Sequence, residues 1–204
     1  MQTDCGSANV IPNLVYPLHS ITDRIDLGRL FPANQPLEIE LGSGDGSFLV
    51  QYASRRPDCN FIGVERLLGR LRKLDRKGRR AGLTNLRGLR IESAYFLRYL
   101  LPAHSATALH VYFPDPWPKR KHRRHRLINE PFVGLAHTAL RAGGTIYLRT
   151  DDSDYFEQMI GVFTSSSAFG RTETPSGLAE QLTDFEREFS ARGIKTLRAA
   201  YQSR

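Results

Sequence analysis

A strand, a glycine-rich turn and a helix follow one another between residues 37 and 55, and this succession constrains the fold most. Residues 37–41 (LEIEL) alternate apolar and acidic side chains, as a strand does. The turn is Gly42-Ser43-Gly44-Asp45-Gly46, and residues 47–55 place apolar side chains at helical spacing. Glycine allows a tight turn and close approach of a ligand, and a helix start carries partial positive charge. Such glycine patterns also occur in ordinary turns, but the flanking elements favour a cofactor loop.

Strands and helices alternate along the rest of the chain, which predicts one α/β domain with a doubly wound, mostly parallel sheet. Residues 1–36 contain four prolines and weak patterning, and we expect an N-terminal arm there, with the main domain spanning 37–204. The segment after Phe169 is expected to add a helix and closing strands. Further strands are predicted at 60–64, 86–91, 108–113 and 145–149, and helices at 67–81, 94–101, 127–142 and 155–163.

Acidic side chains stand at the ends of four predicted strands, namely Glu65, Glu92, Asp115 and Asp151. Glu65 follows Gly46 by 19 residues, where open α/β cofactor domains place the acid that binds ribose hydroxyls. The alternative is an exposed glutamate without a ligand. Because the carboxyl ends of parallel strands meet at one edge, we expect these acids and the glycine turn to face one crevice.

Residues 114–118 (PDPWP) follow the strand at 108–113 with three prolines in five positions. Proline restricts its own backbone and that of the preceding residue, so Asp115 and Trp117 are expected on a stiff, non-helical loop. Eight basic or imidazole residues follow at 119–126. This pattern favours chemistry on a polyanion, against a proline-rich turn followed by a solvated charge run. Trp117 either stacks on a base or anchors the loop in the core.

The charge balance favours nucleic acid as the partner. Lys and Arg total 29 against 21 Asp and Glu, and the predicted helix at 67–81 is basic around most of its circumference. No apolar run approaches the ~20 residues that span a bilayer, and the start lacks the pattern of a secretory signal. Cys5 and Cys59 fit neither a metal pattern nor a disulfide framework. We therefore expect a cytoplasmic protein without metal or membrane association, a monomer or homodimer.

These residues resemble the class I methyltransferases that use S-adenosylmethionine. The match consists of the glycine loop that begins at Glu40, then Glu65 and Glu92 in order and spacing. More narrowly, the sequence resembles the bacterial tRNA (guanine-N7-)-methyltransferases from about Leu37 to the C-terminus. That likeness rests on F-P-D-P-W-x-K at 113–119, the Thr150-Asp151 pair, and T-x-F-E at 183–186 followed by Gly193.

The resemblance implies methyl transfer from S-adenosylmethionine to N7 of a guanine in tRNA, in the variable loop, forming 7-methylguanosine. It implies that Asp115 is catalytic and that Glu38, Gly42, Gly44, Glu65, Glu92 and Asp115 hold the cofactor. It implies RNA contacts by Lys119, Asp151, Thr183, Asp184, Phe185 and Glu186. Three positions depart from the family pattern: Glu92 where Asp is frequent, Glu40 where a small residue is usual, and Asp184 where Lys is frequent.

Two other functions remain open on the sequence. A nicotinamide-dependent oxidoreductase uses the same fold, but G-x-G-x-G in place of G-x-G-x-x-G and the lack of a hydride-transfer site disfavour it. An RNA-binding protein without activity is disfavoured by the presence of Asp115, Glu65 and the glycines.

Overall fold

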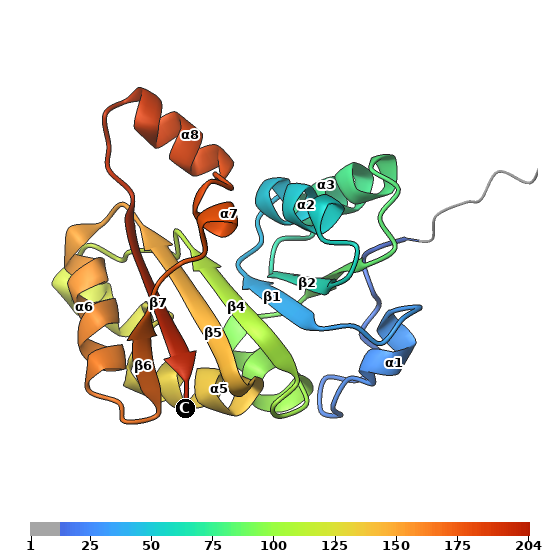
Figure 1. The fold of residues 1–204 in the computed structure, drawn as a ribbon, viewed down its shortest axis with the longest axis horizontal. Coiled ribbons are helices and arrows are strands. Elements are labelled where there is room, and N and C mark those ends of the chain that lie inside the picture. The colour runs from blue at the N-terminus through green and yellow to red at the C-terminus, as the bar shows by residue number, and fades with distance from the viewer. Residues whose placement is uncertain (1–12) are drawn as a thin grey trace, which may run out of the picture.

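The computed structural model describes residues 13–204, so the first twelve residues of the expected arm lie outside the described part. The described chain forms a seven-stranded sheet in the order β3-β2-β1-β4-β5-β7-β6 (Figure 1). Strands β1 to β5 are parallel, and β7 lies antiparallel between β5 and β6. The strands are β1 (Leu37–Leu41), β2 (Asn60–Glu65), β3 (Leu86–Arg90), β4 (Ala106–Tyr112), β5 (Leu140–Thr150), β6 (Phe169–Thr172) and β7 (Leu197–Ser203).

Helices cover both faces of the sheet, as a doubly wound fold requires. On one face α2 (Ser47–Arg55) and α3 (Leu68–Arg80) pack in one apolar cluster. A second, larger cluster on the other face includes η1 (Phe96–Leu100), α5 (Glu130–Ala139) and α6 (Ser153–Thr164). The sequence-predicted α/β class and mostly parallel, doubly wound sheet are confirmed. The remaining helices are α1 (Leu27–Leu30), α4 (Ser93–Tyr95), η2 (Arg120–His125), α7 (Ser176–Ala179) and α8 (Asp184–Ala191).

The described part of the arm packs against the sheet domain. Leu14 is fully buried in the cluster that contains α3, and Val15 forms an isolated bridge with Gly88 of β3. Leu30 and Phe31 are buried in the larger cluster on the opposite face. The arm therefore contributes to both apolar clusters, and the domain boundary at residue 36 stays a prediction. Within residues 13–204 no helix is both long and apolar enough to span a membrane.

The helix expected at 127–142 is shorter in the structure, where α5 covers Glu130–Ala139. Asn129 caps it by accepting a hydrogen bond from the Phe132 amide, and Pro131 occupies its first turn, where proline is well tolerated. Leu140 is already extended and opens β5, which pairs with β4 through a register irregularity between Ala106 and Ala108. The predicted strand at 145–149 is thus only the later part of β5. Residues 140–144, whose pattern also fits a helix, belong to β5 as well and pair with β4 through the irregularity.

The C-terminal tail is fixed to the sheet by a buried ion-pair network. Arg149 on β5 donates to Glu186 of α8 over 2.7 Å, and Arg198 of β7 donates to the other oxygen of that carboxylate over 2.6 Å. Burial alone would raise the pKa of Glu186, but the Thr183 amide and the two guanidinium groups hold it below its ordinary value. The network places α7 and α8 beyond the carboxyl ends of β4 and β5 (Figure 1).

We expect Glu186→Gln to lower the free energy of unfolding by about 3 kcal/mol, because it leaves Arg149 buried without its counter-charge. Glu188→Gln is the matched control, since Glu188 is exposed on the same helix and pairs with Arg192 at only 3.7 Å. The control should change stability by no more than about 0.5 kcal/mol. Urea unfolding measures both variants, and equal losses would contradict the assignment.

Candidate active site

The glycine turn between β1 and α2 has a backbone that only glycine adopts readily. Gly42, Gly44 and Gly46 have φ of 85°, 56° and 76°. At Gly42 and Gly44 the space that a Cβ would occupy is open. At Gly46 a Cβ would lie 2.7 Å from Leu74 of α3, so this glycine is also required by packing. The first two glycines therefore leave room for a ligand against the backbone, and the third fixes the loop against α3.

A cavity of about 420 Å³ lies at the carboxyl ends of the strands, within the usual size range of small-molecule sites. The structure brings Glu65, Glu92 and Asp115 together here with Gly42, whereas Asp151 does not line the cavity. Three of the four strand-end acids thus share one crevice with the glycine loop. The other lining side chains include Arg66, Leu67, Arg70, Tyr112, Phe113, Trp117, His125 and Leu127.

Two of these carboxylates are oriented by backbone amides. Glu65 accepts hydrogen bonds from the Gly44 amide (3.1 Å) and the Leu67 amide (2.8 Å), which links the glycine loop to the start of α3. Glu92 caps α4 by accepting from the Ala94 amide (2.9 Å) and the Tyr95 amide (2.7 Å). Such bonds fix each carboxylate while leaving further acceptor positions for ligand donors.

Asp115 differs from both, because its carboxylate is exposed and accepts no hydrogen bond from a residue of the described chain. The loop that carries it is non-helical, as the prolines predict, and is tightly bent at both ends: φ is 50° at Phe113 and 45° at Trp117. Trp117 remains 36% exposed at the cavity wall, with its ring centroid 5.1 Å from that of His125. This position favours base stacking over a role as a core anchor.

Arg126, at the end of the basic run, anchors this loop through a hydrogen bond to its backbone. It is only 2% exposed, donates from Nε to the Pro116 carbonyl over 2.7 Å, and pairs with Asp154 of α6 over 2.5 Å. Its guanidinium also lies 4.7 Å from the Tyr155 ring centroid. Arg126 therefore differs from the rest of the basic run at 119–126, because its guanidinium is used in internal contacts and is not available to a polyanion.

Glu38 lies apart from the cavity to which the resemblance assigned it. Its carboxylate is 2.8 Å from Nε2 of the buried His110 and 3.3 Å from Arg56, and it lines a different cavity beside α7. Burial would raise the pKa of Glu38, but the contacts with His110 and Arg56 hold it below its ordinary value. Glu38 is thus satisfied by protein partners, and it stands two residues further from the glycine loop than Glu40 does.

Glu40 lies on the same face of β1, and its Oε2 is buried without a hydrogen-bond partner in residues 13–204. The Oγ atom of Ser43 in the glycine loop is likewise unpartnered. Burial raises the pKa of Glu40 to about 8; Arg149 opposes the shift, while Asp45 and Glu65 add to it. Glu40, noted as a family departure, is thus a buried acid on β1 with one oxygen that is unpartnered in the described chain. In the sequence, Glu40 is marked by its position at the start of E-x-G-x-G-x-G.

The predicted RNA-contacting residues divide into exposed and buried groups. Lys119, Asp151, Asp184 and Phe185 are exposed, and 52% of Phe185 is accessible beside Phe113 of the cavity. Thr183 and Glu186 are buried, where they form a reciprocal capping box at the start of α8. The resemblance implies that both contact RNA, but in the structure their polar atoms form the hydrogen bonds that cap α8.

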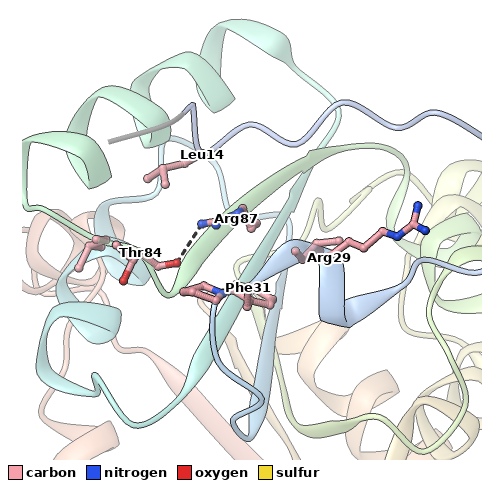
Figure 2. A pocket seen from close by; sticks show the side chains of 8 residues that line it. Leu14, Arg29, Phe31, Thr84 and Arg87 are labelled. Carbon is pink, nitrogen blue, oxygen red and sulfur yellow. Dashed lines mark hydrogen bonds between the residues drawn. The ribbon is translucent and has the colours of Figure 1, made fainter. Parts of the chain in front are cut away.

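A further cavity, between the arm and β3, lies away from this site (Figure 2). Arg87, near the amino end of β3, donates to the Thr84 carbonyl over 3.0 Å and stacks over Phe31. Its lining contains no carboxylate. Among the residues described, no three His, Cys, Asp or Glu side chains cluster as metal ligands.

Comparison with known proteins gives the family context. A family model described as a putative methyltransferase matches residues 34–202. Relatives named tRNA (guanine-N(7)-)-methyltransferase include those of Streptomyces avermitilis (36% identity; 79% of this chain, 58% of the relative), Chromohalobacter salexigens (37%; 74% and 62%) and Sodalis glossinidius (35%; 79% and 70%). The chain thus spans less than two thirds of the first two relatives' length.

Solved structures support the same architecture. The 16S rRNA methyltransferase KamB superimposes with a TM-score of 0.62 at 14% identity, covering 86% of this chain and 91% of that one. TrmN from Thermus thermophilus gives a TM-score of 0.60 at 16% identity, covering 86% and 46%. At these identities the likeness establishes the fold, which is that of class I methyltransferases.

We expect wild-type stability to fall between pH 4.5 and pH 8 relative to Glu40→Gln. In that window the unfolded chain ionises Glu40, whereas the folded chain keeps it protonated up to about pH 8. The glutamine does not titrate, so the variant's stability relative to wild type should rise by up to about 1.4 kcal/mol per pH unit. Urea unfolding at pH 5.5 and pH 7.5 measures this change. Glu188→Gln is the control, and its stability relative to wild type should not change between the two pH values. If the stability of Glu40→Gln relative to wild type is equally independent of pH, the raised pKa of Glu40 is refuted.

Arg126→Met should destabilise the fold by about 2 kcal/mol through loss of its charged hydrogen bonds, whereas Arg124→Met should cost no more than about 0.5 kcal/mol because Arg124 is exposed. Urea unfolding of the two variants tests whether these neighbours differ in role. Equal stability would mean that Arg126 does not anchor the loop.

Proposed function

The chain belongs to the tRNA (guanine-N(7)-)-methyltransferase family, and from this premise we propose that it transfers a methyl group from S-adenosylmethionine to N7 of a guanine in tRNA. The observation that carries the proposal is one cavity that is lined by Gly42 of the glycine loop together with Glu65, Glu92 and Asp115. We further propose that the guanine lies in the variable loop, as the family resemblance implies, and that the reaction takes place in the cytoplasm.

The hydrogen-bond acceptors around the cavity suit the hydroxyl and amino groups of S-adenosylmethionine. The open space at Gly42 and Gly44 admits a ligand against the loop. Glu65 is placed for ribose hydroxyls, and Glu92 would lie on the adenine side. Glu38 is left out of this set, since its partners are His110 and Arg56. When bound, the cofactor supplies a methyl group already activated by its sulfonium.

The protein's main task is orientation. Guanine N7 carries an unprotonated lone pair at neutral pH, so no general base is needed to create the nucleophile. The site must align N7 with the methyl carbon, which is catalysis by positioning. As the bond forms, the purine gains positive charge. The free carboxylate of Asp115 is placed to accept hydrogen bonds from the guanine edge and to stabilise that charge.

Aromatic side chains at the cavity mouth support access to a single base. A guanine within folded RNA must leave its stack to reach a cavity of this kind. Trp117 lines the cavity and is 36% exposed, and the exposed Phe185 of α8 has its ring centroid 5.9 Å from that of Phe113, which also lines the cavity. Stacking on such faces is worth about 1–3 kcal/mol per base and tolerates different bases. We therefore assign the selection of guanine to Asp115 and the holding of the extruded base to these rings.

Basic elements flank the cavity on two sides. Arg66 and Arg70 at the start of α3 line one side, and His125 of η2 lines the other. The exposed cations of α3 and of residues 119–124 extend these flanks. RNA phosphates would neutralise them, so binding should weaken steeply as salt is added. The net charge of +8 agrees in sign with an RNA partner.

The test is transfer of labelled methyl from S-adenosylmethionine to unmodified bulk tRNA, with the product digested and analysed for 7-methylguanosine. We expect label in that nucleoside. Asp115→Asn keeps the shape but removes the charge, so kcat should fall about 100- to 1,000-fold, while tRNA affinity changes much less. Asp58→Asn, at an exposed site away from the cavity, is the matched control and should retain full activity.

Each other outcome has a clear meaning. Label in another nucleoside would keep the methyltransferase and overturn the guanine N7 assignment. Equal losses of turnover and tRNA affinity in Asp115→Asn would overturn its catalytic role. No label, with tRNA still bound, would favour the inactive RNA-binding alternative, and binding of a nicotinamide dinucleotide in place of S-adenosylmethionine would favour the oxidoreductase.

A further inference from the structure

Four elements meet at the side of the glycine loop that faces α3. Asp45 of the loop accepts hydrogen bonds from the amide (3.1 Å) and hydroxyl (2.7 Å) of Ser47, which begins α2. Lys77 of α3 donates to the other oxygen of Asp45 over 2.7 Å and also to the Ser47 hydroxyl. Asp184 of α8 lies near this group: the neighbouring Ser47 holds its pKa below the ordinary value, and Arg187 of the same helix pairs with it.

Lys77 is therefore the cation that pairs with Asp45, whereas Asp184 pairs with Arg187 of α8. Partial burial would raise the pKa of Asp45, but the hydrogen bond from Lys77 holds it below its ordinary value, so the aspartate is ionised at neutral pH. The charge of Asp45 in turn acts against ionisation of Asp184.

Lys77 also differs from the other cations on α3. Arg72, Lys73 and Arg76 are exposed, which suits them to phosphate contact, whereas Lys77 is half-buried against the loop. Leu74, one turn earlier on the same helix face, touches the loop at Gly46. The helix thus contacts the loop at two successive positions, one apolar and one charged.

We propose that Lys77 is a positioning residue for the cofactor: it fixes Asp45, and through Asp45 the loop whose Gly42 and Gly44 face the ligand. The inference rests on the proposed function only in taking the loop as the S-adenosylmethionine site. It assigns Lys77 to the cofactor side of the reaction, apart from the RNA-facing cations of the same helix.

The experiment compares Lys77→Met with Lys73→Met. Calorimetric titration should show the Kd for S-adenosylmethionine raised about fivefold in Lys77→Met, since an exposed or half-exposed ion pair is worth at most about that factor. In steady-state assays KM for the cofactor should rise equally, and kcat at saturating cofactor should stay within about twofold. Lys73→Met should leave cofactor affinity unchanged and weaken tRNA binding alone.

Two further variants separate positioning from a general loss of structure. Lys77→Arg keeps the charge and should restore cofactor affinity to within about twofold of wild type. Asp45→Asn should reproduce Lys77→Met, and the double variant should bind the cofactor no more weakly than either single variant, because both remove one interaction. If Lys77→Met lowers the melting temperature, the Arg rescue and the Asp45→Asn comparison still decide the role.

The outcomes are distinguishable from failure of the proposed function. A wild-type protein that does not bind S-adenosylmethionine would refute the cofactor assignment itself. Wild-type binding together with unchanged Kd in Lys77→Met, or additive losses in the double variant, would overturn the positioning role alone. Equal cofactor losses in Lys77→Met and Lys73→Met would show that Lys77 acts only through the general charge of α3.

Discussion

The position of the C-terminal tail depends on the contacts of one buried guanidinium group, that of Arg149. From β5 it bonds Glu186 of α8 and the backbone carbonyls of Gln181 and Leu178, and it lies 4.2 Å from the Tyr112 ring centroid. Its charge also acts on the buried Glu40. One side chain therefore ties the tail to the sheet and also acts electrostatically on Glu40 of β1. A buried charge of this kind requires its partners, so the position of α8 depends on Arg149.

The carboxylates around the cavity have been given different tasks by their surroundings. Glu65 and Glu92 are held by backbone amides, which orients them toward ligands of fixed shape. Asp115 stands on a stiff loop and has no hydrogen-bond partner within residues 13–204, so its acceptor capacity is available. Burial raises the pKa of Glu40 to about 8, which keeps this carboxyl group largely protonated at neutral pH. These side chains share one chemical group, and the surroundings of each carboxyl group determine what it can bind.

Basic residues are divided in the same manner. They are concentrated at 66–80 and 119–126, yet two of them are held by internal contacts: Arg126 donates to the Pro116 carbonyl, and Lys77 binds Asp45 of the loop. Exposed cations of the same segments, such as Lys73 and Arg124, suit the phosphate backbone of RNA. Substitutions one or a few residues apart should therefore have different effects.

The sequence by itself determined the order of elements, the bounds of β1 and α2, the glycine turn and the edge where the acids gather. These follow from local spacing, proline and glycine geometry, and the rule that parallel strands end together. The tertiary structure alone decided how the two glutamates on one face of β1 differ. Glu38 contacts His110 and Arg56, whereas Oε2 of Glu40 has no hydrogen-bond partner within the part of the chain that the structure describes. It also decided that Thr183, Glu186 and Arg126 are internal, and that β5 begins where a helix pattern still continues. In each case the deciding contact comes from a residue distant in the chain, which periodicity does not reveal.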